Sequence, residues 1–133
     1  MSHSMILRVY YEDTDLAGIV YYANYLKFIE RGRSEWLRAL GIDQAALKRQ
    51  AGLVFAVRRI EADYLRPARF DDLVQVATRL DMLSAARIVM DQTVTRDGEV
   101  LFTAQVTIVC LNEAGAAQRL PADIRRKLAP KLH

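Results

Sequence analysis

The constraint that most limits the fold of this chain is a change of hydrophobic period at Leu53. From Val54 to Cys110, apolar residues recur at every second position in four stretches, with polar residues between them. This spacing predicts four long strands, each with one face in the core and one in water. Asp97 and Gly98, between the third and fourth stretches, predict a tight hairpin. The second half of the chain is therefore expected to form an antiparallel sheet.

The first half of the chain has helical spacing. Apolar residues at positions 25, 28, 29, 32, 36 and 40 predict one helix of about four to five turns. Asn24 is expected to cap this helix and Gly41 to end it. Gly32 lies in its middle, where glycine costs about 1 kcal/mol relative to alanine. Its expected use is to let a sheet or a second copy of the helix approach closely.

Shorter elements complete the pattern. We expect a strand over residues 5–11, a second helix over residues 43–50 and a short basic helix after Pro121. The order of elements predicts an α+β domain in which one sheet covers one helix. A sheet of this size has more apolar surface than one helix can fill, so self-association through an edge or a shared face is expected. The expected core faces are Leu7, Val9 and Tyr11 in the short strand, Val54, Ala56, Ile60, Ala62 and Tyr64 in the first long strand, and Val74, Val76, Leu80 and Met82 in the second.

The composition narrows the class of protein. The 133 residues are 52% hydrophobic and 26% charged, which predicts one globular domain over residues 1–133. No apolar run approaches the roughly 20 residues of a membrane helix, so a cytoplasmic protein is expected. A net charge of +3 from scattered basic residues argues against nucleic-acid binding.

Few residues are available for catalysis. His3 and His133 lie near the chain ends and are expected to be mobile. Cys110 is the only cysteine, so neither a disulfide, a thiolate metal cluster nor a cysteine-histidine pair is expected within the chain. None of the four serines has a nucleophile-elbow pattern. Catalysis without a transition metal would therefore depend on a carboxylate.

The candidate carboxylates lie in residues 10–25, YYEDTDLAGIVYYANY. Glu12, Asp13 and Asp15 precede Gly18 and an expected helix start. One interpretation is a solvated loop, because aspartate is a common turn residue. The other is a reaction centre, because aromatic and β-branched residues enclose the acids and the first N–H groups of a helix form an anion site.

The same loop partly matches a calcium-binding pattern. Asp13, Asp15 and Gly18 fit positions 1, 3 and 6 of an EF-hand loop. Ala17 and Asn24 stand at positions 5 and 12, where ligands are required. The pattern therefore argues against calcium.

Residues 10–41, YYEDTDLAGIVYYANYLKFIERGRSEWLRALG, resemble the signature of the 4-hydroxybenzoyl-CoA thioesterase branch of the hotdog-fold superfamily. The likeness is greatest to its Tol-Pal-associated acyl-CoA thioesterase members (YbgC-like), and it continues through DYLRPARFDDLVQV to the terminal helix. The resemblance implies a long helix wrapped by a curved antiparallel sheet. It also implies edge-to-edge dimers, commonly paired into tetramers, with active sites at the dimer interface.

The resemblance assigns roles to particular residues. Asp15 corresponds to the family's catalytic aspartate, which acts as nucleophile or as general base. The backbone N–H of Tyr22 corresponds to the donor to the thioester carbonyl; many Tol-Pal-associated members have histidine there, whereas tyrosine matches the hydroxybenzoyl type. Gly18 belongs to the same substrate-binding segment. Arg87 and Ser84 lie where relatives hold the nucleotide phosphates of CoA.

Three other charged residues have alternative expected roles. Glu30 and Glu35 lie on the long helix, where a separate hotdog subfamily has its catalytic glutamate; here they are expected on the polar edge or paired with Arg33 or Arg31. Arg58, in an otherwise apolar strand face, is expected either in a buried ion pair or at an interface.

The expected activity is hydrolysis of an acyl-CoA thioester, without a metal or cofactor. An acyl-carrier protein is a second expected thioester donor. A dehydratase of the same fold would need a histidine that the interior of this sequence lacks. The alternative from another class is a non-catalytic module that binds acyl-CoA or acyl-carrier protein.

Overall fold

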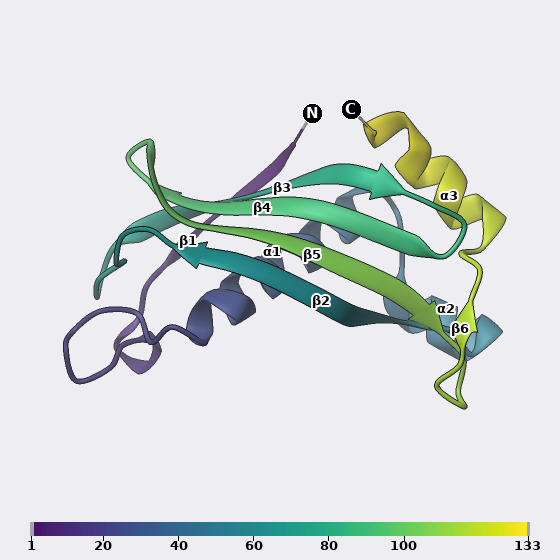
Figure 1. The fold of residues 1–133 in the computed structure, drawn as a ribbon, viewed down its shortest axis with the longest axis horizontal. Helices are drawn as coiled ribbons and strands as arrows, with labels where there is room; N and C mark the ends of the chain where they lie inside the picture. The colour runs from purple at the N-terminus through teal and green to yellow at the C-terminus, as the bar shows by residue number, and fades with distance from the viewer. Residues whose placement is uncertain (1, 133) are drawn as a thin grey trace.

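The structure is a computed structural model that describes residues 2–132. Its central feature is one long helix, α1, lying against one face of a curved antiparallel sheet (Figure 1). This arrangement confirms the expected α+β hotdog fold. The elements are β1 (His3–Arg8), η1 (Tyr11–Asp13), α1 (Asn24–Ala39), α2 (Gln44–Ala51), β2 (Val54–Tyr64), β3 (Leu73–Leu83), β4 (Arg87–Arg96), β5 (Glu99–Leu111), β6 (Ala117–Gln118), α3 (Ala122–Leu128) and η2 (Ala129–Lys131).

The sheet has the order β1-β3-β4-β5-β2, and the short strand β6 pairs with the end of β5. Every pairing is antiparallel, as expected. β1 and β2 are the edges, so within residues 2–132 the 11-residue strand β2 has a partner on one side only. Helix α1 packs mainly on β1, β3 and β4. The half of the inner face that β5 and β2 provide is therefore less well covered.

The long elements agree with the sequence predictions, but the predicted end of β1 and the predicted cap of α1 are wrong. Strand β1 ends at Arg8 rather than at residue 11, because Asp13 bonds back to the amide of Tyr10 and starts a 3-10 turn. Tyr11 is 82% exposed instead of facing the core. Asn24 does not cap α1; Ala23 occupies the cap position, and no side chain bonds there.

Two β-bulges change which residues face the core. One lies between Val57 and Arg59, and another lies between Leu80 and Met82. A bulge adds one residue to a strand and reverses the alternation beyond it. Phe55 and Val57 therefore share the inner face with Ile60, and the predicted inner positions of Val54 and Ala56 are wrong.

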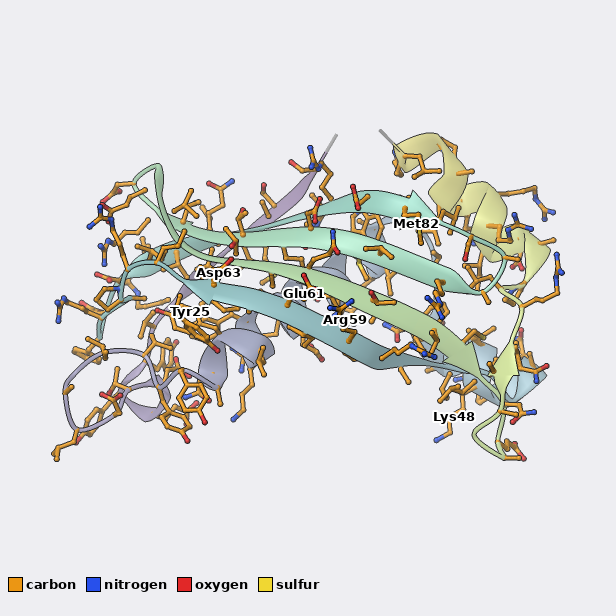
Figure 2. All side chains as sticks on the ribbon, in the orientation of Figure 1. Tyr25, Lys48, Arg59, Glu61, Asp63 and Met82 are labelled. Carbon is orange, nitrogen blue, oxygen red and sulfur yellow. The ribbon has the colours of Figure 1, made fainter. Side chains whose placement is uncertain are left out.

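The second bulge has the same effect near the end of β3. Met82 is 43% exposed, although its spacing predicted a core position (Figure 2). Figure 2 also shows Arg59, Glu61 and Asp63 along β2, where all three are exposed.

Gly32 lets the sheet approach α1, which is one of the two uses expected for it. A Cβ atom at this position would lie 2.7 Å from Cγ1 of Val76 and 3.2 Å from Oγ1 of Thr78. The close approach also brings the helix backbone to a buried polar pair on the sheet. The amide nitrogen of Gln92 donates to the carbonyl of Ile29 and to Oγ1 of Thr78, both at 2.8 Å.

The structure describes the positions of His3 and Cys110. His3 lies in β1 opposite Thr78, so the expectation that it is mobile is wrong. His133 lies outside the described residues. Cys110 is buried in β5, and burial raises the pKa of its thiol. Among the helices of residues 2–132, none is both long and apolar enough to cross a membrane.

Candidate active site

The acidic segment forms a small hydrogen-bonded hairpin rather than a solvated loop. Thr14 pairs with Val20, the amide of Asp15 donates to the carbonyl of Ile19 at 2.9 Å, and the amide of Tyr21 donates to the carbonyl of Asp13 at 2.9 Å. At the tip, the amide of Gly18 donates to the carbonyl of Asp15, with Gly18 at φ +78°. This φ favours glycine, so the role of Gly18 in the structure is to form the turn.

The three acids of this hairpin have different environments. Asp13 is only 9% exposed, and its Oδ2 accepts from the amide of Tyr10 at 2.8 Å. Its carbonyl also accepts from the side chain of Asn24 at 2.9 Å. Asp13 therefore holds the loop together, whereas Glu12 is exposed to solvent.

Asp15 is partly exposed and retains a free oxygen. Its Oδ1 accepts from the amide of Ala17 at 2.9 Å, which orients the carboxylate. Among residues 2–132, no donor bonds to its Oδ2. The carboxylate of Asp15 is thus oriented by one hydrogen bond, and its second oxygen accepts none from residues 2–132.

The start of α1 offers an unused backbone donor. The amide of Asn24 donates to the carbonyl of Tyr21 at 2.8 Å, but the amide of Tyr22 has no acceptor within the described part of the chain. The side chain of Asn24 bonds to Asp13 rather than to this helix end. The residue before the cap of α1 therefore has a free N–H that can donate to a negative oxygen.

An open groove of about 310 Å³ follows this helix start. Tyr64, at the end of β2, forms part of its wall, and the hydroxyl of Tyr64 donates to the carbonyl of Tyr22 at 3.0 Å. Burial raises the pKa of Tyr64. The groove is lined by Ile19, Val20, Tyr22, Tyr25, Tyr64, Leu65, Arg66 and Pro67.

The structure does not bring Ser84 and Arg87 to this groove within one chain. They form the turn between β3 and β4, where Oγ of Ser84 accepts from the amide of Arg87 at 3.0 Å. Strand β3 begins near the groove and runs roughly 33 Å to that turn at 3.3 Å per residue. Arg87, the first residue of β4, is exposed.

The other charged residues match their expectations only in part, and the exposed Glu30 agrees with the expected polar edge of α1. Glu35 pairs with Arg38, not with Arg31 or Arg33. Glu30 has no ion pair within residues 2–132. Arg58 lies at the β2 bulge and is exposed, so the prediction that it forms a buried ion pair is wrong.

Sequence reasoning missed two residues of this region. The strand spacing predicts only a core position for Tyr64. Its hydrogen bond to Tyr22 joins residues 42 positions apart in the chain. The sequence offers Arg33 as one possible ion-pair partner for the glutamates of α1, but its guanidinium donates to Oε1 of Gln92 at 3.1 Å. No local pattern signals either contact, because both depend on how α1 meets the sheet.

Within residues 2–132 no group of three or more His, Cys, Asp or Glu side chains could hold a metal ion. The candidate parts of the site are the carboxylate of Asp15, the free N–H of Tyr22 and the apolar groove.

Comparisons with known proteins identify the family of this chain. Residues 9–128 match the family described as the thioesterase-like superfamily. The sequence is 40% identical over 109 residues to the acyl-CoA thioesterase YbgC of Haemophilus influenzae, across 82% of this chain and 80% of that protein. It is 37% identical over 120 residues to the acyl-CoA thioester hydrolase YbgC of Escherichia coli O6:H1, across 89% of each. A probable thioesterase from Bartonella henselae superposes with a TM-score of 0.86 at 42% identity, over 91% of this chain and 100% of that one.

Proposed function

Because this chain belongs to the thioesterase-like superfamily, we propose that it hydrolyses acyl-CoA thioesters to a free carboxylic acid and CoA. The observation that carries the proposal is that two groups lie on the two arms of one hairpin, whose second arm lines the groove. Asp15 keeps a free carboxylate oxygen, and Tyr22 keeps a free N–H at the start of α1. Acyl transfer needs these two parts, a nucleophile or base and a donor to the developing oxyanion.

In the proposed reaction, the N–H of Tyr22 donates to the thioester carbonyl oxygen. Asp15 then acts in one of two ways. As nucleophile it attacks the carbonyl carbon, the C–S bond breaks, CoA leaves as thiolate, and water hydrolyses the mixed anhydride. As general base it takes a proton from water, the hydroxide attacks, and the proton passes to the departing sulfur. Both routes require an ionised Asp15.

We also propose that two copies pair through β2. Its unpaired edge is 11 residues long and carries no proline, and such an edge favours strand addition. Antiparallel pairing about the middle of the strand, near Arg59, would bring Tyr64 of one copy close to Val54 of the other. Each groove would then be completed by the partner, and such dimers could pair again into tetramers.

This pairing would give Arg87 and Ser84 a role despite their distance from Asp15. Arg87 lies in the same cross-strand row as Val109 and Ala56, close to the beginning of β2. That end of one copy would face the groove of the other. The proposed role of Arg87 and Ser84 is to bind the nucleotide phosphates of a CoA held in the partner's groove.

The proposed setting is the cytoplasm, with the whole chain acting as one domain. The single cysteine is buried and unpaired, which suits a reducing compartment.

The test is release of free thiol from a panel of acyl-CoAs and an acylated acyl-carrier protein. Asp15→Asn keeps the shape of the side chain and removes its charge, so we expect kcat/KM to fall by about a hundredfold or more. Glu12→Gln, two residues after Tyr10 in the same loop, is the matched control and should retain wild-type rates. Equal rates for wild type and Asp15→Asn would refute the role of Asp15.

Two further measurements separate the alternatives. Binding of acyl-CoA without turnover on any thioester would favour the non-catalytic module. Light scattering at micromolar concentration is expected to give a dimer or a tetramer. A monomer that retains full activity would contradict an active site completed by a partner.

A further inference from the structure

A second cavity lies further along α1, between the helix and the sheet. Its volume is about 260 Å³, the volume of roughly eight water molecules. It opens where α1 leaves the inner face of β5 and β2 less well covered. The apolar walls are Leu37, Phe55, Val57, Ile88, Met90 and Ile108, and the polar lining is Glu30, Arg33, Ser34 and Gln44. We call this cavity the Arg33 pocket.

Arg33 brings a charge into this pocket that no carboxylate neutralises. Its guanidinium has five N–H donors, but it makes one hydrogen bond, to Oε1 of Gln92 at 3.1 Å. Arg33 forms no ion pair with any residue of the range 2–132. Burial lowers the pKa of Arg33, and the charge of Glu30 only partly opposes this effect. Partly buried charges are normally paired, so an anionic ligand would supply the partner that Arg33 lacks among residues 2–132.

A hydrogen bond to Gln92 on the sheet orients the guanidinium of Arg33. Gln92 is 1% exposed, and its amide nitrogen already donates to Ile29 and Thr78. Its oxygen must therefore point toward Arg33. A guanidinium held in this way loses little conformational entropy when it binds a ligand. Arg33 is thus prepared to form hydrogen bonds with a planar anion, and carboxylates match its geometry.

From these contacts we infer that Arg33 binds a carboxylate at the far end of the acyl group. The substrates that fit this pocket are CoA half-thioesters of dicarboxylic acids. The apolar walls hold the methylene chain, and Arg33 pairs with the terminal carboxylate. This inference rests on the proposed thioesterase function and assigns its substrate class.

Two features set the details of this recognition. Glu30 also lines the pocket, but it is exposed, so water screens its repulsion of the ligand. Along α1 the distance from Tyr22 to Arg33 is roughly 16 Å at 1.5 Å per residue. Pairing through β2 would place the partner's groove closer to the pocket. Acyl chains of up to eight carbons are too short to span roughly 16 Å, so they would reach Arg33 from the partner's groove.

The experiment compares matched acyl-CoA pairs that differ only at the end of the chain. Butyryl-CoA is paired with succinyl-CoA, hexanoyl-CoA with adipoyl-CoA, and octanoyl-CoA with suberoyl-CoA. For at least one length, wild type should prefer the carboxylate-ended member by about tenfold or more in kcat/KM. Arg33→Met should abolish that preference and Arg33→Lys should keep part of it. Glu30→Gln should increase it.

The control is Arg38→Met, which removes the same charge from an exposed position of the same helix outside the pocket. It should leave the preference unchanged. Calorimetric binding of the same pairs to Asp15→Asn, with and without Arg33→Met, tests the pocket even if no thioester is hydrolysed. Equal affinity of Asp15→Asn for both members at every length overturns the inference. Loss of turnover with an intact carboxylate preference in binding overturns only the proposed hydrolysis.

Discussion

The hydroxyl of Tyr64 donates a 3.0 Å hydrogen bond to the carbonyl oxygen of Tyr22. Tyr64 lies at the end of the edge strand β2, and Tyr22 lies immediately before α1. The two rings also meet edge to face, with centroids 6.2 Å apart. The edge of the sheet thereby holds the peptide that follows the proposed oxyanion donor.

Tyr64→Phe tests this positioning role. The variant keeps the ring and loses the hydrogen bond, worth about 1 kcal/mol. We expect kcat for thioester hydrolysis to fall about fivefold with an unchanged KM. Tyr11→Phe, an exposed tyrosine of the same loop, is the control and should behave as wild type. An unchanged kcat in a Tyr64→Phe variant of lowered thermal stability would show that the bond is only structural.

Gly32→Ala tests the close packing of α1 on the sheet. The new Cβ would lie 2.7 Å from Cγ1 of Val76. We expect the free energy of unfolding to fall by about 1–3 kcal/mol, although alanine favours the helix by about 1 kcal/mol. Urea denaturation measures the change. In a Val76→Ala background the same substitution should cost less, because the clashing methyl group is gone. A stabilised single variant would refute the contact.

Asp72 predicts a pH dependence of stability near the groove. Burial raises the pKa of Asp72, but hydrogen bonds from the amide of Arg69 at 2.8 Å and from Arg96 at 2.7 Å outweigh it, and the pKa lies below its usual range. A depressed pKa contributes stability above the unfolded-state pKa, and this contribution is lost as the pH falls through the folded-state value.

Asp72→Asn should therefore lower the free energy of unfolding by about 1 kcal/mol at pH 7. The difference from wild type should shrink as the pH falls below the ordinary range of aspartate. Urea denaturation from pH 7 to pH 3 measures it. Asp63→Asn, an exposed aspartate of β2, is the control and should show no such trend. A constant difference across this range would contradict the ion-pair contribution.

Local patterns predicted much of the fold. The helical spacing before Gly41 and the alternation after Leu53 correspond to α1 and to the four long strands. Both patterns depend on which face of one element is apolar, and neighbouring positions in the chain determine that. The hairpin at Asp97 and Gly98 was likewise predictable, because an Asp-Gly pair favours a turn in which both residues have positive φ. Both residues have positive φ in the structure.

The candidate site was predictable only in part. The sequence singled out the loop with Asp15 by its composition and its position before a helix. It could not show that Asp13 is the structural acid of the three, because the bonds of Asp13 depend on how the hairpin folds. The roles of Asp15, Tyr22, Ser84 and Arg87 in catalysis and binding stay predictions.

The sequence by itself determined the order of elements, the apolar face of α1 and the position of the acidic loop, because these follow from periodicity and turn chemistry over a few residues. Only the tertiary structure decided that a bulge puts Val57 and Ile60 on the same face of β2, that Tyr64 bonds to Tyr22, and that Arg33 turns toward Gln92. The physical reason is sequence separation. These contacts join residues 42 and 59 positions apart, and their geometry exists only once the helix has packed on the sheet.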